Sequence, residues 1–191
     1  MKRSALFHHH RHAGARFTDY HGWELPSGFS SPETEAAHVQ EFVGLADLSY
    51  RAKFETASAP LQNGWRLGED RYLLIGEPPM TAPADAFEIT SVYTNLLLAG
   101  PRSRDVMGKL TSLNTSEARL PNLACAQASM AHVHTIVLHE DLLREGKPPI
   151  PAYHLLVSRD YAESVWEAVA HAGEEFTLRG FGLKALADLR V

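Results

Sequence analysis

The chain has almost no cysteine and no long apolar run. Cys125 is the single cysteine among 191 residues, so a disulfide framework within the chain is excluded and a reducing compartment is the simpler expectation. No apolar stretch approaches the roughly 20 residues that a membrane-spanning helix needs. The first residues also lack the apolar core of a secretion signal, so we expect a cytoplasmic protein without membrane contact.

An excess of basic charge is missing as well. The 18 Lys and Arg residues face 23 Asp and Glu residues, which gives a formal net charge of −5. Proteins that bind nucleic acid normally carry a basic face, so the composition argues against a nucleic-acid partner. With 45% hydrophobic residues, the chain is long enough to form one domain with a substantial core.

The first quarter of the chain is divided by strong local signals. A short helical run ends at Gly14, residues 16–20 are extended, and residues 21–26 are predicted to form a turn. Ser31 is a suitable N-cap because Pro32 follows at the first helical position. Gly44 is predicted to stop that helix.

Later segments alternate less regularly between helix and strand. The apolar–polar alternation over residues 127–139 predicts one long strand, and residues 140–151 are predicted to be a charged loop. Asp160, with Glu163 three residues on, predicts a capped helix. Further strands are expected at residues 52–57, 70–76, 87–90, 93–98 and 153–157, a connector at residues 61–68, and helices at residues 100–110 and 181–189. Because several strands follow one another, the expected fold class is α+β, with a mixed, mainly antiparallel sheet covered by helices.

Two histidine pairs are spaced so that each could hold a metal ion. His8 and His12 would share one helix face, and His132 and His134 one strand face. Solvated histidines are the favoured interpretation of both pairs, and neither Cys nor a carboxylate joins the second pair at a useful spacing. The sequence therefore predicts no metal site.

Three stretches carry a family resemblance. The matches in the first, over residues 5–54, are Leu6, Gly14, Ala15, Gly22, Trp23, Pro26, Glu35, Val39, Gly44, Leu45, Asp47 and Ser49. This block and the ending over residues 182–190 resemble the folate-binding domain of the glycine-cleavage T-protein family, the aminomethyltransferases. The stretch over residues 67–173, which contains Leu67-Gly68-Glu69-Asp70 and Cys125-Ala126, is similar to the gamma subunit of heterotetrameric sarcosine oxidase.

The resemblance implies one folate-binding-type domain over residues 1–191 that takes tetrahydrofolate in one-carbon metabolism. Two departures imply weakened chemistry. The family's Gly-Gly-x-x-Asp-Asp-like strand has no counterpart between Phe54 and Tyr72, and its Gly-aromatic-Glu becomes Ala152-Tyr153-His154. A neutral histidine offers one donor and one acceptor, where a carboxylate offers two acceptor oxygens.

Three functions remain open on this basis. The chain could be an active tetrahydrofolate-dependent aminomethyltransferase, although the missing carboxylates argue against that. It could be a degenerate folate-binding module, in a larger complex of the sarcosine-oxidase type or as a homodimer. It could also be an interaction scaffold that kept the fold and lost the ligand.

No catalytic residue is assigned from the sequence. Of the candidates for the pocket lining, Trp23 and Tyr153 are favoured as core residues, and Arg190 has an equal claim as an ion-pair partner at the helix end. The full set of candidates is Trp23, Tyr50, Tyr72, Tyr153, His154 and Arg190.

Overall fold

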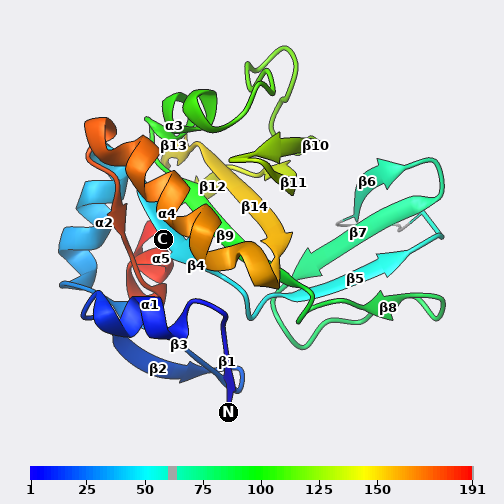
Figure 1. Cartoon of the computed structure of the whole chain (residues 1–191), viewed down its shortest axis with the longest axis horizontal. Coiled ribbons are helices and arrows are strands. Elements are labelled where there is room, and N and C mark those ends of the chain that lie inside the picture. Colours follow the sequence, from blue (N-terminus) through cyan, green and yellow to red (C-terminus); the bar gives the residue numbers. More distant parts are fainter. Residues whose placement is uncertain (60–63, 191) are drawn as a thin grey trace.

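A six-stranded sheet forms the centre of the molecule (Figure 1). This computed structural model describes residues 1–59 and 64–190. All neighbouring strands are antiparallel except β15, which runs parallel to β4. The strands, in spatial order, are β10 (Cys125–Met130), β11 (Val133–His139), β14 (Ala152–Ser158), β9 (Tyr93–Ala99), β4 (Gly44–Asp47) and β15 (Arg179–Gly180).

Three smaller sheets surround the central one. The largest of them extends away from the helices in Figure 1 and has the order β6-β7-β5-β8, formed by Gly64–Gly68, Arg71–Gly76, Ala52–Thr56 and Phe87–Glu88. The N-terminal sheet has the order β1-β3-β2, formed by Lys2–Arg3, Trp23–Gly28 and Arg16–Tyr20. A hairpin joins β12 (Leu142–Arg144) to β13 (Lys147–Ile150).

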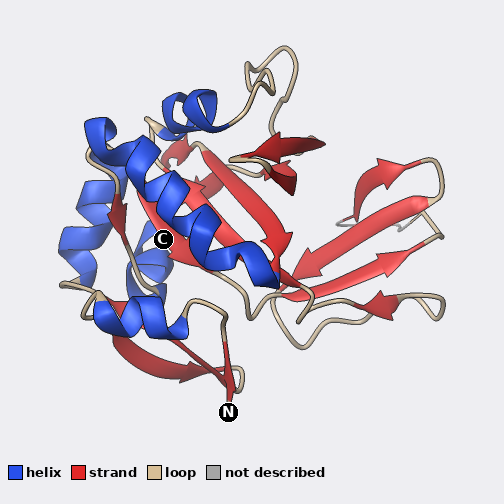
Figure 2. Ribbon diagram, viewed as in Figure 1, coloured by secondary structure: helices blue, strands red, loops and turns tan. Residues whose placement is uncertain are grey.

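The helices pack on both faces of the central sheet, as Figure 2 shows in blue. They are α1 (Phe7–His12), α2 (Pro32–Glu41), α3 (Ser103–Leu110), α4 (Ala162–Gly173) and α5 (Leu183–Leu189). Side chains of α3 and α4 join one buried cluster, and side chains of α2 and α5 join another. The expected α+β fold with a mainly antiparallel sheet is thereby confirmed. No helix within the described residues is both long and apolar enough to cross a membrane.

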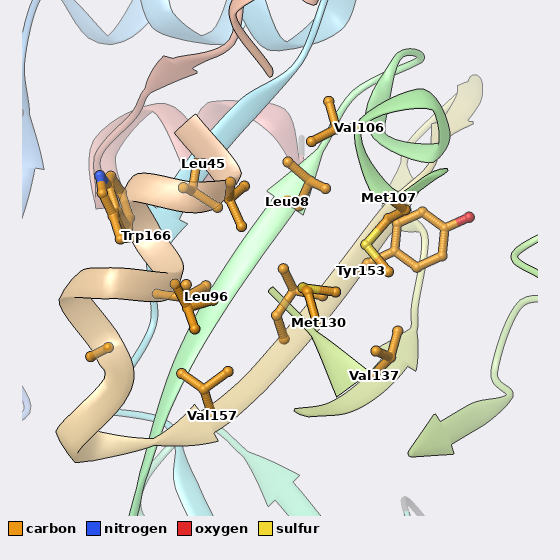
Figure 3. Packing of buried hydrophobic residues seen from close by; sticks show 14 of the residues in the cluster. Leu45, Leu96, Leu98, Val106, Met107, Met130, Val137, Tyr153, Val157 and Trp166 are labelled. Carbon is orange, nitrogen blue, oxygen red and sulfur yellow. The ribbon is translucent and has the colours of Figure 1, made fainter. Parts of the chain in front are cut away.

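Strand alternation assigns side chains to the two layers. Leu96 and Leu98 of β9 point to α3 and α4, whereas Leu97 between them joins the layer under α2 and α5. Figure 3 shows the first layer, in which Leu96 and Leu98 lie with Met107, Tyr153 and other apolar side chains. These residues are fully buried, and burial of a large aliphatic side chain contributes roughly 1.5–3 kcal/mol.

A third apolar cluster joins the four-stranded sheet β6-β7-β5-β8, called the extended sheet below, to the central sheet. Trp65, Leu73 and Ile75 of β6 and β7 pack against Ile136, Leu138 and Leu156 of β11 and β14. The two sheets therefore meet over β11 and β14 of the central sheet, which fixes the ends of β5 and β7 near β14.

The local signals of the first quarter are largely confirmed. Ser31 Oγ accepts a hydrogen bond from the Thr34 backbone N–H at 3.2 Å, and Gly14 adopts a φ of +79° just after α1. The prediction for Gly44 was wrong, because α2 ends at Glu41 and Gly44 begins β4. A Cβ at Gly44 would lie 2.5 Å from Val39 and 2.6 Å from Phe181, so packing of the sheet against its neighbours requires this glycine.

One predicted turn is shorter than expected, and a second turn was not predicted. His21 and Gly22 have φ values of +51° and +77°, so the turn is two residues long and Trp23–Gly28 is strand β3. Ala131 and His132, with φ values of +48° and +67°, divide the predicted single strand into the hairpin β10–β11. An Ala-His turn lacks the Asn-Gly or Asp-Gly pattern that normally marks a tight hairpin. The apolar–polar alternation over residues 127–139 therefore predicted one continuous strand.

Two further expectations are corrected. Residues 140–151 contain the β12–β13 hairpin instead of a plain loop. Asp160 lies in a 3₁₀ turn, Arg159–Tyr161, and provides no side-chain cap for α4. The segment over residues 61–68 was predicted to be a connector, but its last five residues form β6, and residues 61–63 lie outside the described residues.

Candidate functional site

A polar groove lies where the extended sheet meets the central one. Two adjoining pockets, of about 430 and 360 Å³, share Arg51, Glu77, Leu123 and Glu140 in their walls. Arg51 directly precedes β5, Glu77 directly follows β7 and Glu140 directly follows β11. Strand ends from both sheets thus place charged side chains around one hollow.

His154 forms the buried wall of the groove. Alternation along β14 sends Tyr153 into the layer under α3 and α4, so His154 faces the opposite side, between Ala152 and Leu156. Its side chain is 1% exposed. Nε2 lies 3.2 Å from Glu140 Oε2 and 3.2 Å from an Arg51 guanidinium nitrogen.

Burial favours the neutral form of this imidazole. Desolvation is the main cause that lowers the pKa of His154 to about 4, with Arg51 acting in the same direction. A neutral ring has one N–H, and donation from Nε2 to the Glu140 carboxylate leaves Nδ1 as an acceptor. Asn95 lies on the Nδ1 side, with Oδ1 at 3.2 Å, and its Nδ2 has no partner among the described residues. Exchanging the amide oxygen and nitrogen of Asn95 gives His154 Nδ1 a donor.

Glu140 is the carboxylate at the mouth of the groove. Hydrogen bonding to His154, followed by the charges of His154, Arg51 and Arg190, lowers the pKa of Glu140 to about 2 despite partial burial. Its side chain is 38% exposed. Glu140 is therefore an ionised acceptor at neutral pH that a ligand can reach.

Glu77 supplies a second carboxylate. Tyr50 donates its hydroxyl to Glu77 Oε1 at 2.9 Å, and Arg190 lies 3.7 Å from the same oxygen. Arg51 lies between the two carboxylates, 3.8 Å from Glu77 and 3.7 Å from Glu140. Burial and the nearby Glu77 raise the pKa of the Tyr50 hydroxyl.

A buried lysine holds the turn that carries Tyr50 and Arg51. The Lys53 ammonium donates to the backbone carbonyl of Ser49 at 3.0 Å and to that of Arg51 at 2.9 Å. Lys53 is fully buried, and desolvation lowers its pKa to about 7. Because both carbonyls belong to the turn, Lys53 positions the groove residues without reaching the groove itself.

The six predicted pocket residues separate into two groups. Tyr50, His154 and Arg190 gather around Glu77 and Glu140. Trp23 packs in the layer under α2 and α5, and Tyr72 is half-buried on β7 outside the groove walls.

Tyr153 lies on the other side of the sheet from the groove. Its ring stacks on His139 at 4.6 Å, and Arg104 Nε donates to its hydroxyl at 3.3 Å. Since neighbouring residues of a strand point to opposite faces, Tyr153 and His154 do not line the same hollow. Whether any of the six contacts a ligand stays a prediction.

Sequence reasoning missed Arg51, Glu77 and Glu140. A carboxylate was sought only between Phe54 and Tyr72 and at the position of His154. The Glu140 backbone N–H donates to the Ala152 carbonyl at 3.0 Å, so Glu140 lies across from the start of β14. This proximity depends on the pairing of β11 with β14, although a charged residue directly after a buried strand was a usable signal.

One cluster within the described residues has the composition of a cation site. Ligand atoms of His9, Glu163 and Glu167 all lie within 4.8 Å of one another. Both glutamates are exposed, and His9 Nδ1 lies 3.9 Å from Glu163, which is equally the geometry of a solvated ion pair joining α1 to α4. His8, His12, His132 and His134 are exposed.

Comparison with known proteins identifies the family. The model of the GCVT N-terminal domain matches residues 70–191, and the chain belongs to this family. It is 24% identical to an aminomethyltransferase of Halothermothrix orenii over the whole chain and 65% of that protein. It is 30% identical to the sarcosine oxidase subunit alpha of Rhizobium meliloti over 54% of this chain and 10% of that protein. The chain thus spans somewhat less than two thirds of the aminomethyltransferases that it matches.

Solved structures agree on the fold. The aminomethyltransferase T of the glycine cleavage system from Bartonella henselae superimposes with a TM-score of 0.75 at 15% identity, over 99% of this chain and 62% of that one. A chain of the heterotetrameric sarcosine oxidase from Corynebacterium sp. U-96 gives a TM-score of 0.58 at 15% identity, over 78% of this chain and 96% of that one. The expected T-protein fold is confirmed.

Proposed function

We propose that residues 1–191 act as one tetrahydrofolate-binding, aminomethyltransferase-like domain of one-carbon metabolism. The domain is catalytically degenerate and works within a larger assembly of the sarcosine-oxidase type. The observation that carries the proposal is the Glu140 carboxylate, which is ionised, reachable from solvent and oriented by His154. Glu140 offers a hydrogen-bond acceptor beside His154, the position at which the family resemblance implied that a carboxylate had been lost.

The groove fits the polar edge of a pterin ring. That edge presents N–H donors, and an ionised carboxylate is an acceptor with two oxygens. Glu140 Oε2 faces His154, and Oε1 has no hydrogen-bond partner among the described residues. Leu123, 70% exposed and shared by both pockets, supplies an apolar contact for the flat ring. Its φ of +66° is strained for a leucine, and strain of this kind is common at binding sites.

Binding is better supported than transfer chemistry. A general base works best with a pKa near the operating pH, and the pKa of Glu140 lies at about 2. Glu77 is engaged by Tyr50 and Arg190. Neither carboxylate is therefore suited to exchange protons with a reacting amine, which supports a degenerate domain.

A role as a subunit rests on the structural comparison. The chain accounts for 96% of one chain of a heterotetrameric sarcosine oxidase, so a domain of this extent can form a separate polypeptide in a larger enzyme. Partner subunits would supply the catalytic groups that the groove lacks.

An interaction scaffold is the second candidate. Leu123 and Leu143 are 70% and 72% exposed, and both line the same pocket. Apolar side chains at a groove also suit a segment of a partner protein. Arg51 and Arg190 would then serve only to neutralise the charges of Glu77 and Glu140.

The deciding experiment is calorimetric titration of tetrahydrofolate into the full chain. We expect the wild type to bind, and Glu140→Gln to weaken binding at least about tenfold, or roughly 1.4 kcal/mol. His154→Glu should also change the affinity strongly, because it replaces the donor to Glu140. Glu145→Gln, an exposed glutamate outside the groove, is the control and should bind like the wild type.

Two outcomes would redirect the proposal. If the wild type does not bind at high folate concentration, the groove is not a folate site in this chain and the scaffold function is favoured. If the chain binds but Glu140→Gln is neutral, the ligand site lies elsewhere.

A further inference from the structure

A second pocket lies at the β15 edge of the central sheet, away from the groove beside β14. It encloses about 320 Å³ between α1, α2, α4 and β15. Three aromatic side chains, Phe29, Trp166 and Phe181, stand in its wall. The volume is near the lower end of the range for ligand pockets, so it suits a molecule built on a single ring.

The acceptor capacity of this pocket is already occupied. Glu35 is the carboxylate among its lining residues, and it is 5% exposed. Its oxygens accept hydrogen bonds from the backbone N–H groups of Phe29 at 2.6 Å, Ser30 at 2.5 Å and Gly182 at 2.9 Å. Glu35 therefore holds three loop amides in place and offers little to a ligand that donates hydrogen bonds.

A cationic donor, by contrast, is open. Arg179 is exposed and forms no ion pair with another described residue. His10 is 1% exposed, and its Nε2 faces Asp47 at 3.3 Å. His9 and His38 complete the set of imidazoles in the wall, and His38 Nε2 is engaged with the Thr177 carbonyl at 2.6 Å.

We propose that this pocket is a second ligand site, for a compact aromatic carboxylate. The ring of such a ligand would lie against Trp166, Phe29 and Phe181, and its carboxylate would face the Arg179 guanidinium. Aromatic walls and a guanidinium with no acidic partner match both parts of that molecule. The site is separate from the proposed folate groove and does not depend on it.

The test uses benzoate as the probe and the Trp166 indole N–H signal in two-dimensional NMR as the readout. We expect saturable shifts of that signal with a dissociation constant on the order of 1 mM, which is reasonable for a ligand of this size. Benzamide keeps the ring and shape but removes the charge, and it should bind at least fivefold more weakly. Arg179→Gln should weaken benzoate binding by a similar factor.

Two variants complete the design. Lys184→Gln removes an equal charge from an exposed position outside the pocket wall and should leave benzoate binding unchanged. Ala13→Trp places a large side chain at the rim and should abolish the Trp166 shift, with melting temperature as the check on folding. The proposal is overturned if benzoate leaves the Trp166 signal unperturbed. It is also overturned if benzamide binds the wild type as tightly as benzoate does and the Arg179→Gln variant binds benzoate as tightly as the wild type does.

Discussion

Among the buried histidines that face a carboxylate, His10 and His154 have surroundings that differ. His10 Nε2 lies 3.3 Å from Asp47, and His154 Nε2 lies 3.2 Å from Glu140; both imidazoles are 1% exposed. The carboxylates differ sharply, because Asp47 is fully buried and Glu140 is 38% exposed. The same two chemical groups therefore form an enclosed contact in one place and an accessible site in the other.

The neighbours explain the difference. Asp47 accepts from the Ser49 backbone N–H at 3.0 Å and from the Ser49 hydroxyl at 2.5 Å, within a polar pocket that α1 closes. Burial raises the pKa of Asp47, but the contacts with His10 and Ser49 outweigh it and the pKa lies below its usual value. Glu140 instead stands at a strand end beside Arg51, where solvent and ligands have access.

Removing Asp47 should have the largest effect. Asp47→Ala leaves His10 and the Ser49 N–H unpaired in the core, and breaking a buried pair of this kind costs about 3–5 kcal/mol. Urea unfolding followed by circular dichroism measures the change, with the exposed Asp188→Ala as the control. A loss below about 1 kcal/mol would show that the enclosed pair contributes no more than a surface pair.

Lys53 connects the two sites, since its ammonium holds the carbonyls of Ser49 and Arg51 on the segment that runs from Asp47 to Arg51. Lys53→Met should reduce the free energy of unfolding by about 2 kcal/mol, because the carbonyls of Ser49 and Arg51 lose their donor. It should also weaken tetrahydrofolate binding through displacement of Arg51. Chemical denaturation and calorimetry on the same samples separate the two effects, and unchanged binding would contradict the positioning role.

Acid should lower the free energy of unfolding in two stages through the His154–Glu140 pair. The pKa of His154 falls from 6.5 to about 4 on folding, so the unfolded chain takes up a proton between pH 6.5 and 4 and stability falls as the pH drops through that window. Glu140, with a pKa lowered from 4.5 to about 2, extends the loss below pH 4.5. The expected first-stage change is on the order of 1–2 kcal/mol.

His154→Gln should flatten the first stage. Unfolding free energies measured at several values of pH between 7 and 4 provide the test. Burial also lowers the pKa of His9, so a smaller slope should remain. His134→Gln, which alters an exposed histidine, should retain the full slope, and an equal slope in His154→Gln would contradict the assignment.

Glu140→Gln should have the smallest effect on stability. The carboxylate is more than one third exposed, so its ion pair with Arg51 contributes within about 1 kcal/mol. Thermal melting at pH 7 checks this expectation. A large loss would mean that Glu140 resembles Asp47 as a structural residue, and the comparison between the two pairs would fail.

Much of the fold could be predicted from local chemistry. The Ser31-Pro32 helix start, the positive φ at Gly14 and the apolar strands β7, β9 and β14 follow from short patterns that act over a few residues. The Ala131-His132 turn was missed because it lacks the usual turn residues, whereas Asp160 has the residue pattern of a cap but does not act as one. The order of family motifs, from Gly22-Trp23 to the last helix, predicted the fold as a whole.

The groove was only half predictable. Tyr50, His154 and Arg190 came from positions in the family pattern, and the structure brings them together. Arg51, Glu77 and Glu140 came from the pairing of strands that are far apart in the chain.

The sequence by itself determined the composition of the layers, because alternation within a strand assigns each side chain to one face. The family resemblance also predicts that the histidine of Ala152-Tyr153-His154 stands where the family has a carboxylate. Only the tertiary structure decided that Glu140 lies 3.2 Å from that histidine and that Tyr153 points away from it. Contacts between distant strand ends depend on sheet order and register, which are properties of the whole packed chain and not of any one segment.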